Sequence, residues 1–233
     1  MSTTHNETRA RVGFLVCFAV KEEAAGFDGP LPRVKDGRDM IITGMGRRNA
    51  SEHFRKALER LSPDRVLTCG FAGALNPVLK IGDVLFDEDF DAGLTDKLGV
   101  LGALPAKFYC STRVAVTVAE KTELRRSTGA DAVEMESAVI RTLCREQKIP
   151  SATIRVISDT ASEDLPLDFN TLMTSDQKIS FPKLALALLK SPQKVPRLMS
   201  LQTNTHQAAR RLAEVLNGLL HGFGNDGSSV VCR

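Results

Sequence analysis

Short apolar runs rich in β-branched residues alternate along the chain with stretches in which apolar residues recur at helical spacing. Strands are predicted at Val12–Val20, Asp39–Thr43, Arg65–Cys69, Asp83–Phe86, Arg113–Val118, Asp131–Glu134 and Ser151–Ser158. Helices are predicted at Asn49–Leu61, Ala119–Ser127, Ser137–Gln147, Phe181–Leu189 and Pro196–Leu219. Such alternation is typical of helices packed on a largely parallel sheet. We therefore expect an α/β fold of three α/β/α layers with a central mixed, largely parallel twisted sheet.

The same periodicity indicates a single domain. The chain has 233 residues, of which 42% are hydrophobic, enough for one sizeable core. Residues 1–10 and 222–233 lack periodicity, so a flexible N-terminal arm and a flexible C-terminal tail are expected around a domain at 11–221. Residues Asp87 to Lys107 are rich in acids and glycines and are predicted to form a long loop, a feature that is often functional.

The charge balance argues against nucleic acid as a partner. The chain carries 31 Lys and Arg against 28 Asp and Glu, a formal charge of +3, and it has no Trp and one Tyr on which bases could stack. The longest early apolar run, Val12–Val20, is too short for a membrane span. We therefore expect neither a nucleic-acid partner nor a membrane span.

The cysteines and histidines indicate neither a disulfide framework nor a metal site. The five cysteines are odd in number and widely spaced, without a CxxC pair, so reduced thiols in a cytoplasmic protein are expected. Cys17, Cys69 and Cys144 stand among apolar neighbours, where a small buried hydrophobe is a better interpretation than a nucleophile. None of the four histidines has a partner that would complete a triad.

Acidic residues follow three of the predicted strands. Val133-Glu134-Met135-Glu136 lie where a strand passes into a helix, Glu22-Glu23 follow the first strand, and Ser158-Asp159 follow a later one. Because open α/β sheets bind ligands at the carboxyl ends of their strands, we expect a pocket that these acids share. Each acid also has a simpler explanation: Asp159 could cap a turn, and Glu23 and Glu136 could be exposed first-turn helix acids.

Two glycine-bearing loops follow predicted strands. The backbone N–H groups of Gly44-Met45-Gly46, just before a helix, could hold an anion or a polarised water. A dinucleotide-binding fingerprint would need a further glycine where Asn49 stands, which disfavours that cofactor. The small residues of Gly70 to Pro77 permit close backbone approach, although a tight turn beside the sheet explains them equally well. The basic stretch Lys190 to Arg211 could face an anion but is more typical of a solvated helix face.

Six short motifs occur in an order that resembles one enzyme superfamily. They are Ala19-Val20-Lys21-Glu22-Glu23, Thr43-Gly44-Met45-Gly46, Gly70-Phe71-Ala72-Gly73-Ala74-Leu75, Ile81-Gly82-Asp83-Val84, Val133-Glu134-Met135-Glu136 and Arg155-Val156-Ile157-Ser158-Asp159. Together they resemble the purine nucleoside phosphorylase and methylthioadenosine/S-adenosylhomocysteine nucleosidase superfamily, phosphorylase family 1. The C-terminal part, Leu165 to Leu216, is more similar to the hopanoid-associated phosphorylase branch.

The resemblance implies how the acids divide the chemistry. Breaking a ribose–purine bond places positive charge on the sugar and negative charge on the departing base, so one carboxyl protonates the base and another activates the nucleophile. By resemblance, Asp159 is the acid at purine N7 and Ser158 orients it. Glu23 is the base or the group that positions water.

The resemblance also assigns the residues around the sugar and the base. Glu136 should accept hydrogen bonds from the ribose hydroxyls, Met135 should pack against the ribose face, and Glu134 should support them. Two departures stand out. Phe71 occupies a place where the nucleosidases carry a small or hydroxyl residue, and the usual purine-stacking aromatic has no counterpart, so Val118 is the candidate to cover the base.

Hydrolysis of a purine nucleoside, an adenosine derivative substituted at C5′ such as methylthioadenosine or S-adenosylhomocysteine, is the activity that the resemblance favours. No metal or organic cofactor is implied. The alternative is phosphorolysis of the hopanoid-associated type, with inorganic phosphate as co-substrate. The anion or nucleophile would then be held by residues of the two glycine-bearing loops, namely Gly44, Gly46, Arg47, Arg48, Gly70 and Gly73.

A third possibility is a nucleoside-binding module without catalysis, which the presence of both Glu23 and Asp159 argues against. The expected partner is a small-molecule nucleoside. Relatives of this type pair their subunits, so a homodimer is expected, with the Asp87–Lys107 segment as a candidate contact that closes the 5′ end of the site.

Overall fold

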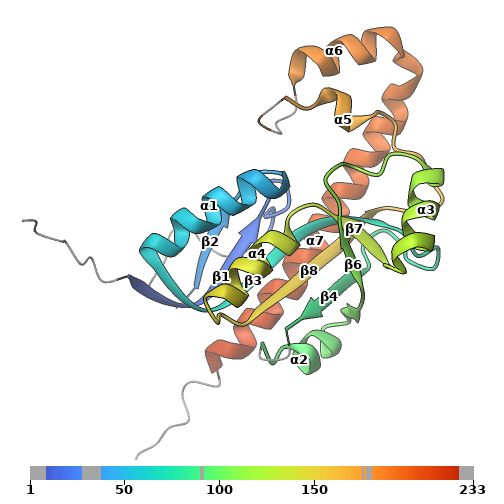
Figure 1. The fold of residues 1–233 in the computed structure, drawn as a ribbon. Helices are drawn as coiled ribbons and strands as arrows, with labels where there is room; N and C mark the ends of the chain where they lie inside the picture. Colours follow the sequence, from blue (N-terminus) through green and yellow to red (C-terminus); the bar gives the residue numbers. More distant parts are fainter. Residues whose placement is uncertain (1–8, 28–37, 90–91, 175, 177–179, 226–233) are drawn as a thin grey trace, which may run out of the picture.

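One mixed sheet forms the centre of the protein in the computed structural model, which describes residues 9–27, 38–89, 92–174, 176 and 180–225 (Figure 1). Its strands run in the order β2-β1-β3-β8-β4-β5, and β7 and β6 extend from the end of β3. The strands are β1 (Ala10–Phe18), β2 (Arg38–Ile42), β3 (Leu61–Ala74), β4 (Val84–Glu88), β5 (Leu104–Pro105), β6 (Phe108–Cys110), β7 (Ala132–Glu134) and β8 (Ser151–Asp159). The pairs β1–β2, β1–β3 and β3–β8 are parallel, whereas β4 runs antiparallel to β8.

Helices cover both faces of this sheet. Helices α1 (Gly46–Arg60) and α4 (Ser137–Glu146) pack on one face, while α7 (Val195–Asn225) and α2 (Thr95–Val100) pack on the other (Figure 1). Alternate side chains of β1 serve the two layers: Leu15 contributes to the core with α1 and α4, and Val16 to the core with α7. The three-layer, single-domain α/β architecture predicted from the sequence is confirmed.

The expected helices are all present, but the predicted strand Arg113–Val118 is wrong. That segment is a loop that leads into α3 (Val118–Thr128). The Thr117 side chain accepts a hydrogen bond from the Glu120 amide, and the Glu120 side chain accepts one from the Thr117 amide, forming a capping box. The β-branched residues thus precede a helix, and the neighbouring strand is the shorter β6.

Asp87–Lys107 contains more regular structure than the predicted long loop. It holds the end of β4, helix α2 and strand β5. The Glu88 carboxylate accepts hydrogen bonds from the amides of Leu94 and Thr95, both at 2.8 Å, so the start of the short helix α2 has an acceptor from outside the helix. A four-residue helix, α5 (Phe169–Leu172), also went unpredicted.

The ends of the regular structure differ slightly from the predicted domain limits. Strand β1 begins at Ala10, and residues 1–8 of the predicted arm lie outside the described residues. Helix α7 continues through Gly222 to Asn225, so part of the predicted tail is helical, and residues 226–233 lie outside the described residues.

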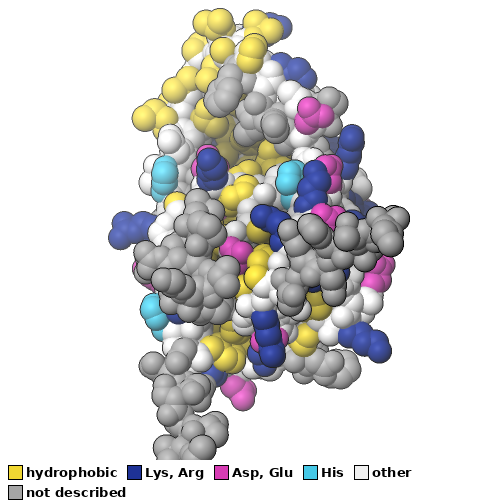
Figure 2. Space-filling view, turned by 90° about the vertical axis from the view of Figure 1, so that its left-hand side faces the viewer, with side chains coloured by type: hydrophobic (Ala, Val, Ile, Leu, Met, Phe, Trp, Pro, Cys, Tyr) yellow, Lys and Arg dark blue, Asp and Glu magenta, His cyan; other side chains and the backbone are white. Residues whose placement is uncertain are grey.

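An arm made of α6 (Phe181–Lys190), the short η2 turn (Pro192–Lys194) and the first part of α7 projects from the sheet (Figure 1). Figure 2 shows hydrophobic side chains gathered at this end of the molecule, and Leu186, Leu189 and Met199 are exposed. None of the described helices combines the length and apolar character needed to cross a membrane.

Candidate active site

The carboxyl ends of β1, β3 and β8 and the segment after β7 surround a cavity of about 210 Å³. This arrangement follows from the parallel pairing of β1, β3 and β8, which brings the ends of these strands to the same edge of the sheet. Of the residues expected at the site, those that line the cavity are Glu23, Phe71, Gly73, Glu134, Met135, Glu136, Ser158 and Asp159.

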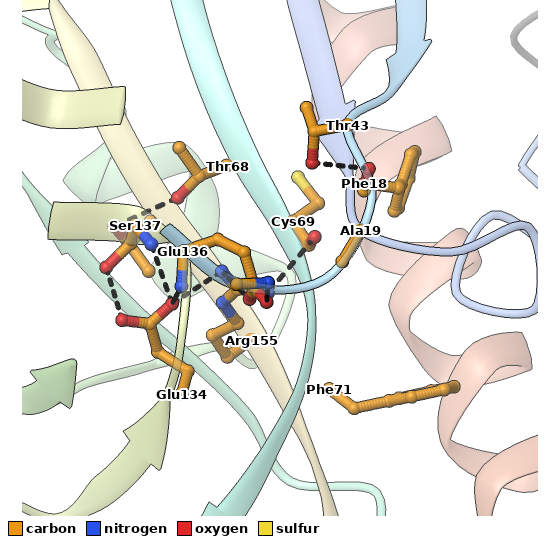
Figure 3. Close-up of polar contacts among 12 residues, drawn as sticks. Phe18, Ala19, Thr43, Thr68, Cys69, Phe71, Glu134, Glu136, Ser137 and Arg155 are labelled. Atoms are coloured by element: carbon orange, nitrogen blue, oxygen red, sulfur yellow. Dashed lines mark hydrogen bonds and ion pairs between the residues drawn. The ribbon is translucent and has the colours of Figure 1, made fainter. Parts of the chain in front are cut away.

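A buried arginine lies behind the cavity. Arg155 projects from the middle of β8 with 1% of its surface exposed. Its Nη2 atom is 2.7 Å from Glu134 Oε2 and 3.6 Å from Glu136 Oε2, and its Nη1 atom donates to the Cys69 carbonyl (Figure 3). Burial alone would lower the pKa of Arg155, but the surrounding glutamates raise it. A fixed positive charge therefore sits among the acids.

Glu23 is held in place by three backbone donors. Its Oε2 atom accepts from the amides of Ala19 at 2.8 Å and Val20 at 3.2 Å, and its Oε1 atom accepts from the amide of Phe71 at 2.9 Å. Burial raises the pKa of Glu23, and Arg155 and the three amides offset part of that effect. With 6% of its surface exposed, Glu23 lies in a turn and is not the exposed helix acid of the simpler explanation.

The glycines of the second loop give these acids room. Gly70 has a φ of +153°, and a Cβ atom there would lie 2.4 Å from Arg155 Nη1 and 2.4 Å from Glu23 Oε1. A Cβ on Gly73 would lie 3.0 Å from Asp159 Oδ2. Both glycines therefore allow carboxylates to approach the β3 backbone, which a larger residue at 70 would prevent.

Glu134 has its hydrogen-bonding capacity filled by the protein. It accepts from the amides of Glu136 and Ser137, from the Ser137 hydroxyl and from Arg155, all within 2.7–2.9 Å (Figure 3). Burial alone would raise the pKa of Glu134, but Arg155 and these donors hold it below its ordinary value. This acid remains charged and orients its neighbours.

Glu136 is the N-cap residue of α4, but its side chain reaches across to α1. Its Oε1 atom accepts a hydrogen bond of 2.8 Å from the Gly46 amide, at the start of α1. Burial raises the pKa of Glu136 to about 7, with Glu23 and Glu134 adding to the shift and Arg155 opposing it. Glu136 therefore changes its protonation state near neutral pH, and it does not stabilise its own helix as a first-turn acid would.

Asp159 is anchored through both oxygens. Its Oδ1 atom accepts from the Ser158 hydroxyl at 2.9 Å, and its Oδ2 atom accepts from Lys121 Nζ at 2.6 Å. The side chain of Lys121 is fully buried, whereas 14% of the Asp159 side chain remains exposed. Asp159 thus faces the cavity with its orientation fixed from the side of α3.

The structure does not bring every expected residue to the cavity. Val118 begins α3 and lines a separate hollow with Leu75 and Thr122. Arg47 and Arg48 are exposed on α1. Gly44, with a φ of +80°, forms the turn before α1 and is likewise absent from the cavity lining.

The rim on the other side of the cavity consists of Arg113, Val114 and Ala115. Arg113 is ion-paired with Glu120 at 2.6 Å. Asn170 holds the rim through two bonds to the Val114 backbone: its Oδ1 atom accepts from the amide at 2.9 Å and its Nδ2 atom donates to the carbonyl at 3.0 Å. This loop therefore lines the cavity, whereas Val118 does not.

Sequence reasoning missed both buried cations. Arg155 carries a detectable signal, because it is the one charged residue between Ser151 and Ser158 and must find a partner when that strand is buried. Lys121 carries none, since its neighbours in α3 include Glu120 and Glu123 and resemble a solvated helix face.

Comparison with known proteins gives a consistent picture. The family model described as Phosphorylase superfamily matches residues 103–190. The chain is 28% identical over 171 residues to the 5′-methylthioadenosine/S-adenosylhomocysteine nucleosidase of Shewanella sediminis (strain HAW-EB3), covering 58% of this chain and 74% of the relative. It is 27% identical over 173 residues to the aminodeoxyfutalosine nucleosidase of Campylobacter jejuni (strain ATCC 700819 / NCTC 11168), covering 60% and 76%.

Solved structures share the fold. Futalosine hydrolase of Helicobacter pylori strain 26695 superimposes with a TM-score of 0.63 at 18% identity, covering 90% of this chain and 97% of that one. The 5′-methylthioadenosine/S-adenosylhomocysteine nucleosidase of Neisseria meningitidis in complex with methylthio-immucillin-A gives a TM-score of 0.64 at 18% identity, covering 90% and 98%.

Replacing Arg155 with Met should lower the free energy of unfolding by about 3–5 kcal/mol at pH 8, because it leaves buried carboxylates without their cation. In the variant, the folded-state pKa of these carboxyls lies above the unfolded-state value. Ionising them as pH rises therefore destabilises the folded state. The deficit should therefore shrink as pH falls toward 5. Urea unfolding across this range measures it.

Arg11→Met is the matched control. Arg11 pairs with Asp64 at the surface, with 80% of its side chain exposed, so its loss should stay under about 1 kcal/mol at every pH. An Arg155→Met deficit that equals the control, or that does not change with pH, would show that charge compensation does not hold the cluster together.

Proposed function

We propose that this chain, whose residues 103–190 match the phosphorylase superfamily model, hydrolyses the N-glycosidic bond of a purine nucleoside. The observation that carries the proposal is the presence of two anchored carboxyls, Glu23 and Asp159, in one cavity. Bond cleavage by water needs one group to orient the nucleophile and another to protonate the leaving base. A nucleoside-binding module without catalysis would need neither.

Each residue then has a defined task. Asp159 gives its proton to the purine as the C1′–N9 bond breaks and the bonding electrons pass to the base. Glu23 accepts a proton from the water that forms the new bond to C1′. Glu136 accepts hydrogen bonds from the ribose hydroxyls, and Met135 packs against the ribose. Arg155 holds the glutamates in position through its ion pairs and does not contact the substrate.

Phe71 acts through its backbone near the nucleophile. Its amide fixes Glu23, while its ring extends away from the Arg155 cluster toward α7 (Figure 3). Phe71 stands where the nucleosidases carry a small or hydroxyl residue, and this change therefore does not remove a polar side chain that the hydrolytic step requires. On the base side, the Arg113–Ala115 rim covers the purine in place of a stacking aromatic.

The substrate we propose is an adenosine derivative substituted at C5′. Support comes from the relatives, whose names give 5′-methylthioadenosine, S-adenosylhomocysteine and aminodeoxyfutalosine as the compounds cleaved. The name 5′-methylthioadenosine describes a nucleoside with a methylthio group at C5′, so an apolar substituent at that carbon is the feature that we test. Methylthioadenosine is the probe of choice.

Phosphorolysis as in the hopanoid-associated branch is the second candidate, and the geometry supports it less. The Gly46 amide is already bonded to Glu136, and Arg47 and Arg48 are exposed and absent from the cavity lining. Among the described residues that line the cavity, Arg113 is the only Lys or Arg, and it is paired with Glu120. A phosphate dianion would therefore meet carboxylates without a charge-assisted clamp.

Phosphate dependence separates the two candidates. With methylthioadenosine, we expect adenine release in phosphate-free buffer, methylthioribose as the sugar product, and a change of less than about threefold on adding phosphate. Arg47→Ala and Arg48→Ala should behave like the unaltered protein. A sugar 1-phosphate product whose formation requires phosphate, and which either arginine variant abolishes, would make the protein a phosphorylase.

The pH dependence of kcat/KM should report Glu136. Because its pKa is about 7 and the carboxylate form accepts from ribose hydroxyls, kcat/KM should fall as pH decreases through 7. Glu136→Gln should remove this limb. It should also cost about as much as a 2′-deoxy substrate does, and the two losses should not add.

Glu146→Gln, at the exposed end of the same helix, serves as the control and should leave the profile unchanged. Additive losses, or an acid limb that persists in Glu136→Gln, would place Glu136 away from the ribose.

A homodimer is also proposed, with the Asp87–Lys107 segment near the contact. Exposed apolar side chains in this segment, Val100 at 88% and Leu104 at 48%, support it. Light scattering should report twice the chain mass at micromolar concentration, and Val100→Asp should shift the mass toward that of one chain. A monomer with full activity at nanomolar concentration would remove the proposal.

A further inference from the structure

Lys121 occupies a position that packing alone does not explain. It is the one residue of α3 that is buried, and no part of its side chain is exposed. Moving an ammonium group out of water is strongly unfavourable unless charges and hydrogen bonds compensate it. A leucine or methionine would fill this space without that cost, so the charge itself must have a use.

Three acceptors bind the ammonium group. Lys121 Nζ is 2.6 Å from Asp159 Oδ2, 2.6 Å from the Thr160 carbonyl and 3.0 Å from the Glu163 carbonyl. An ammonium has three N–H donors, so each has a partner. The two carbonyls fix the lysine in place, and the lysine in turn fixes the carboxyl of Asp159.

Asp159 has little remaining freedom as a result. The Ser158 hydroxyl holds its other oxygen, and the side chain borders the cavity. Lys121 itself is absent from the cavity lining, so it acts on a substrate only through Asp159. Its charge matters most when Asp159 is negative, because opposite charges at this separation attract strongly where water is excluded.

We propose that Lys121 is a positioning residue for acid catalysis. This inference rests on the proposed function, in which the Asp159 O–H bond breaks, a proton passes to purine N7 and the base departs with the electrons of the C1′–N9 bond. Asp159 is then left as a carboxylate. Lys121 holds that carboxylate in line with the base and compensates the charge that forms on it during the reaction.

Two substrates with different leaving groups test the inference. Methylthioadenosine needs a proton on its base, whereas the 4-nitrophenyl β-riboside of 5-methylthioribose releases a stable phenolate without one. Lys121→Met should lower kcat for methylthioadenosine by about 10²–10³-fold, within the usual range for loss of acid catalysis, and kcat for the nitrophenyl riboside by less than about threefold. Asp159→Asn should show the same selectivity, with a loss of about 10²–10⁴-fold on methylthioadenosine.

Because both residues serve one proton transfer, Lys121→Met should add less than about threefold in the Asp159→Asn background. Lys107→Met is the matched control: Lys107 Nζ binds the Thr128 carbonyl at the other end of α3, on the surface, and its loss should leave both rates unchanged. Lys121→Gln removes the charge but keeps a hydrogen-bond donor. If Lys121→Met does not fold, the kcat losses of Lys121→Gln on the two substrates are compared instead.

The outcomes distinguish a failure of the role of Lys121 from a failure of the proposed function. Equal losses on both substrates would show that Lys121 only maintains the fold, and would overturn the inference. The proposed function would still stand if the unaltered protein hydrolyses methylthioadenosine. Unchanged turnover of methylthioadenosine by either Lys121 variant would also overturn it. If the unaltered protein cleaves neither substrate, the proposed function fails and the inference fails with it.

Discussion

The ion pairs of Arg155 hold together the elements that form the cavity. A guanidinium inside a sheet is unfavourable unless acids surround it, and here the acids come from distant parts of the sequence. Glu134 ends β7, Glu136 precedes α4 and Glu23 follows β1, while the Cys69 carbonyl belongs to β3. Each of these elements must take its observed position if the charge on β8 is to be compensated.

The two buried cations divide the acids between them. Arg155 lies with the glutamates on the side that we assign to water and ribose, and Lys121 lies with Asp159 on the side that we assign to the base. Burial raises the pKa of Glu136 to about 7, and repulsion from Glu23 and Glu134 adds to the shift. The closer contact with Arg155 and several hydrogen bonds instead keep the pKa of Glu134 below its ordinary value. Neighbouring carboxyls thereby acquire different protonation states.

Periodicity was sufficient to predict the layers, because α1, α4 and the C-terminal part of α7 each bury an apolar face against the sheet. The convergence of Glu23 and Asp159 was also predictable, since the parallel strands β1 and β8 end at one edge of the sheet. Glu134 and Glu136 reach the same place by another route, because β7 runs antiparallel to β3. Local sequence propensity gave wrong predictions for segments whose structure depends on contacts with other parts of the chain. The run Arg113–Val118 has the composition of a strand, yet Thr117 and Glu120 form a helix cap, and the short strands β5 and β6 exist only through pairing with β4 and β7.

The burial of Lys121 could not be predicted from the sequence, whereas Arg155 stands out as a charge inside a strand. Lys121 contacts Asp159, 38 positions further along the chain, and the helix around it carries the charges of a surface helix. Nothing local distinguishes a lysine that faces solvent from one that faces a carboxyl across a domain. Only the packing of α3 against the segment after β8 makes that distinction.

The two bonds from Asn170 to Val114 have a consequence for how the protein can diversify. They fasten the rim from outside, through backbone atoms, so the side chains at 113–115 can be exchanged without disturbing that attachment. Gly70, by contrast, tolerates no side chain, because Arg155 and Glu23 occupy the space. Under the proposed function, variants with a different base specificity can therefore arise through the rim side chains, whereas a substitution at Gly70 disturbs the acids assigned to the sugar side.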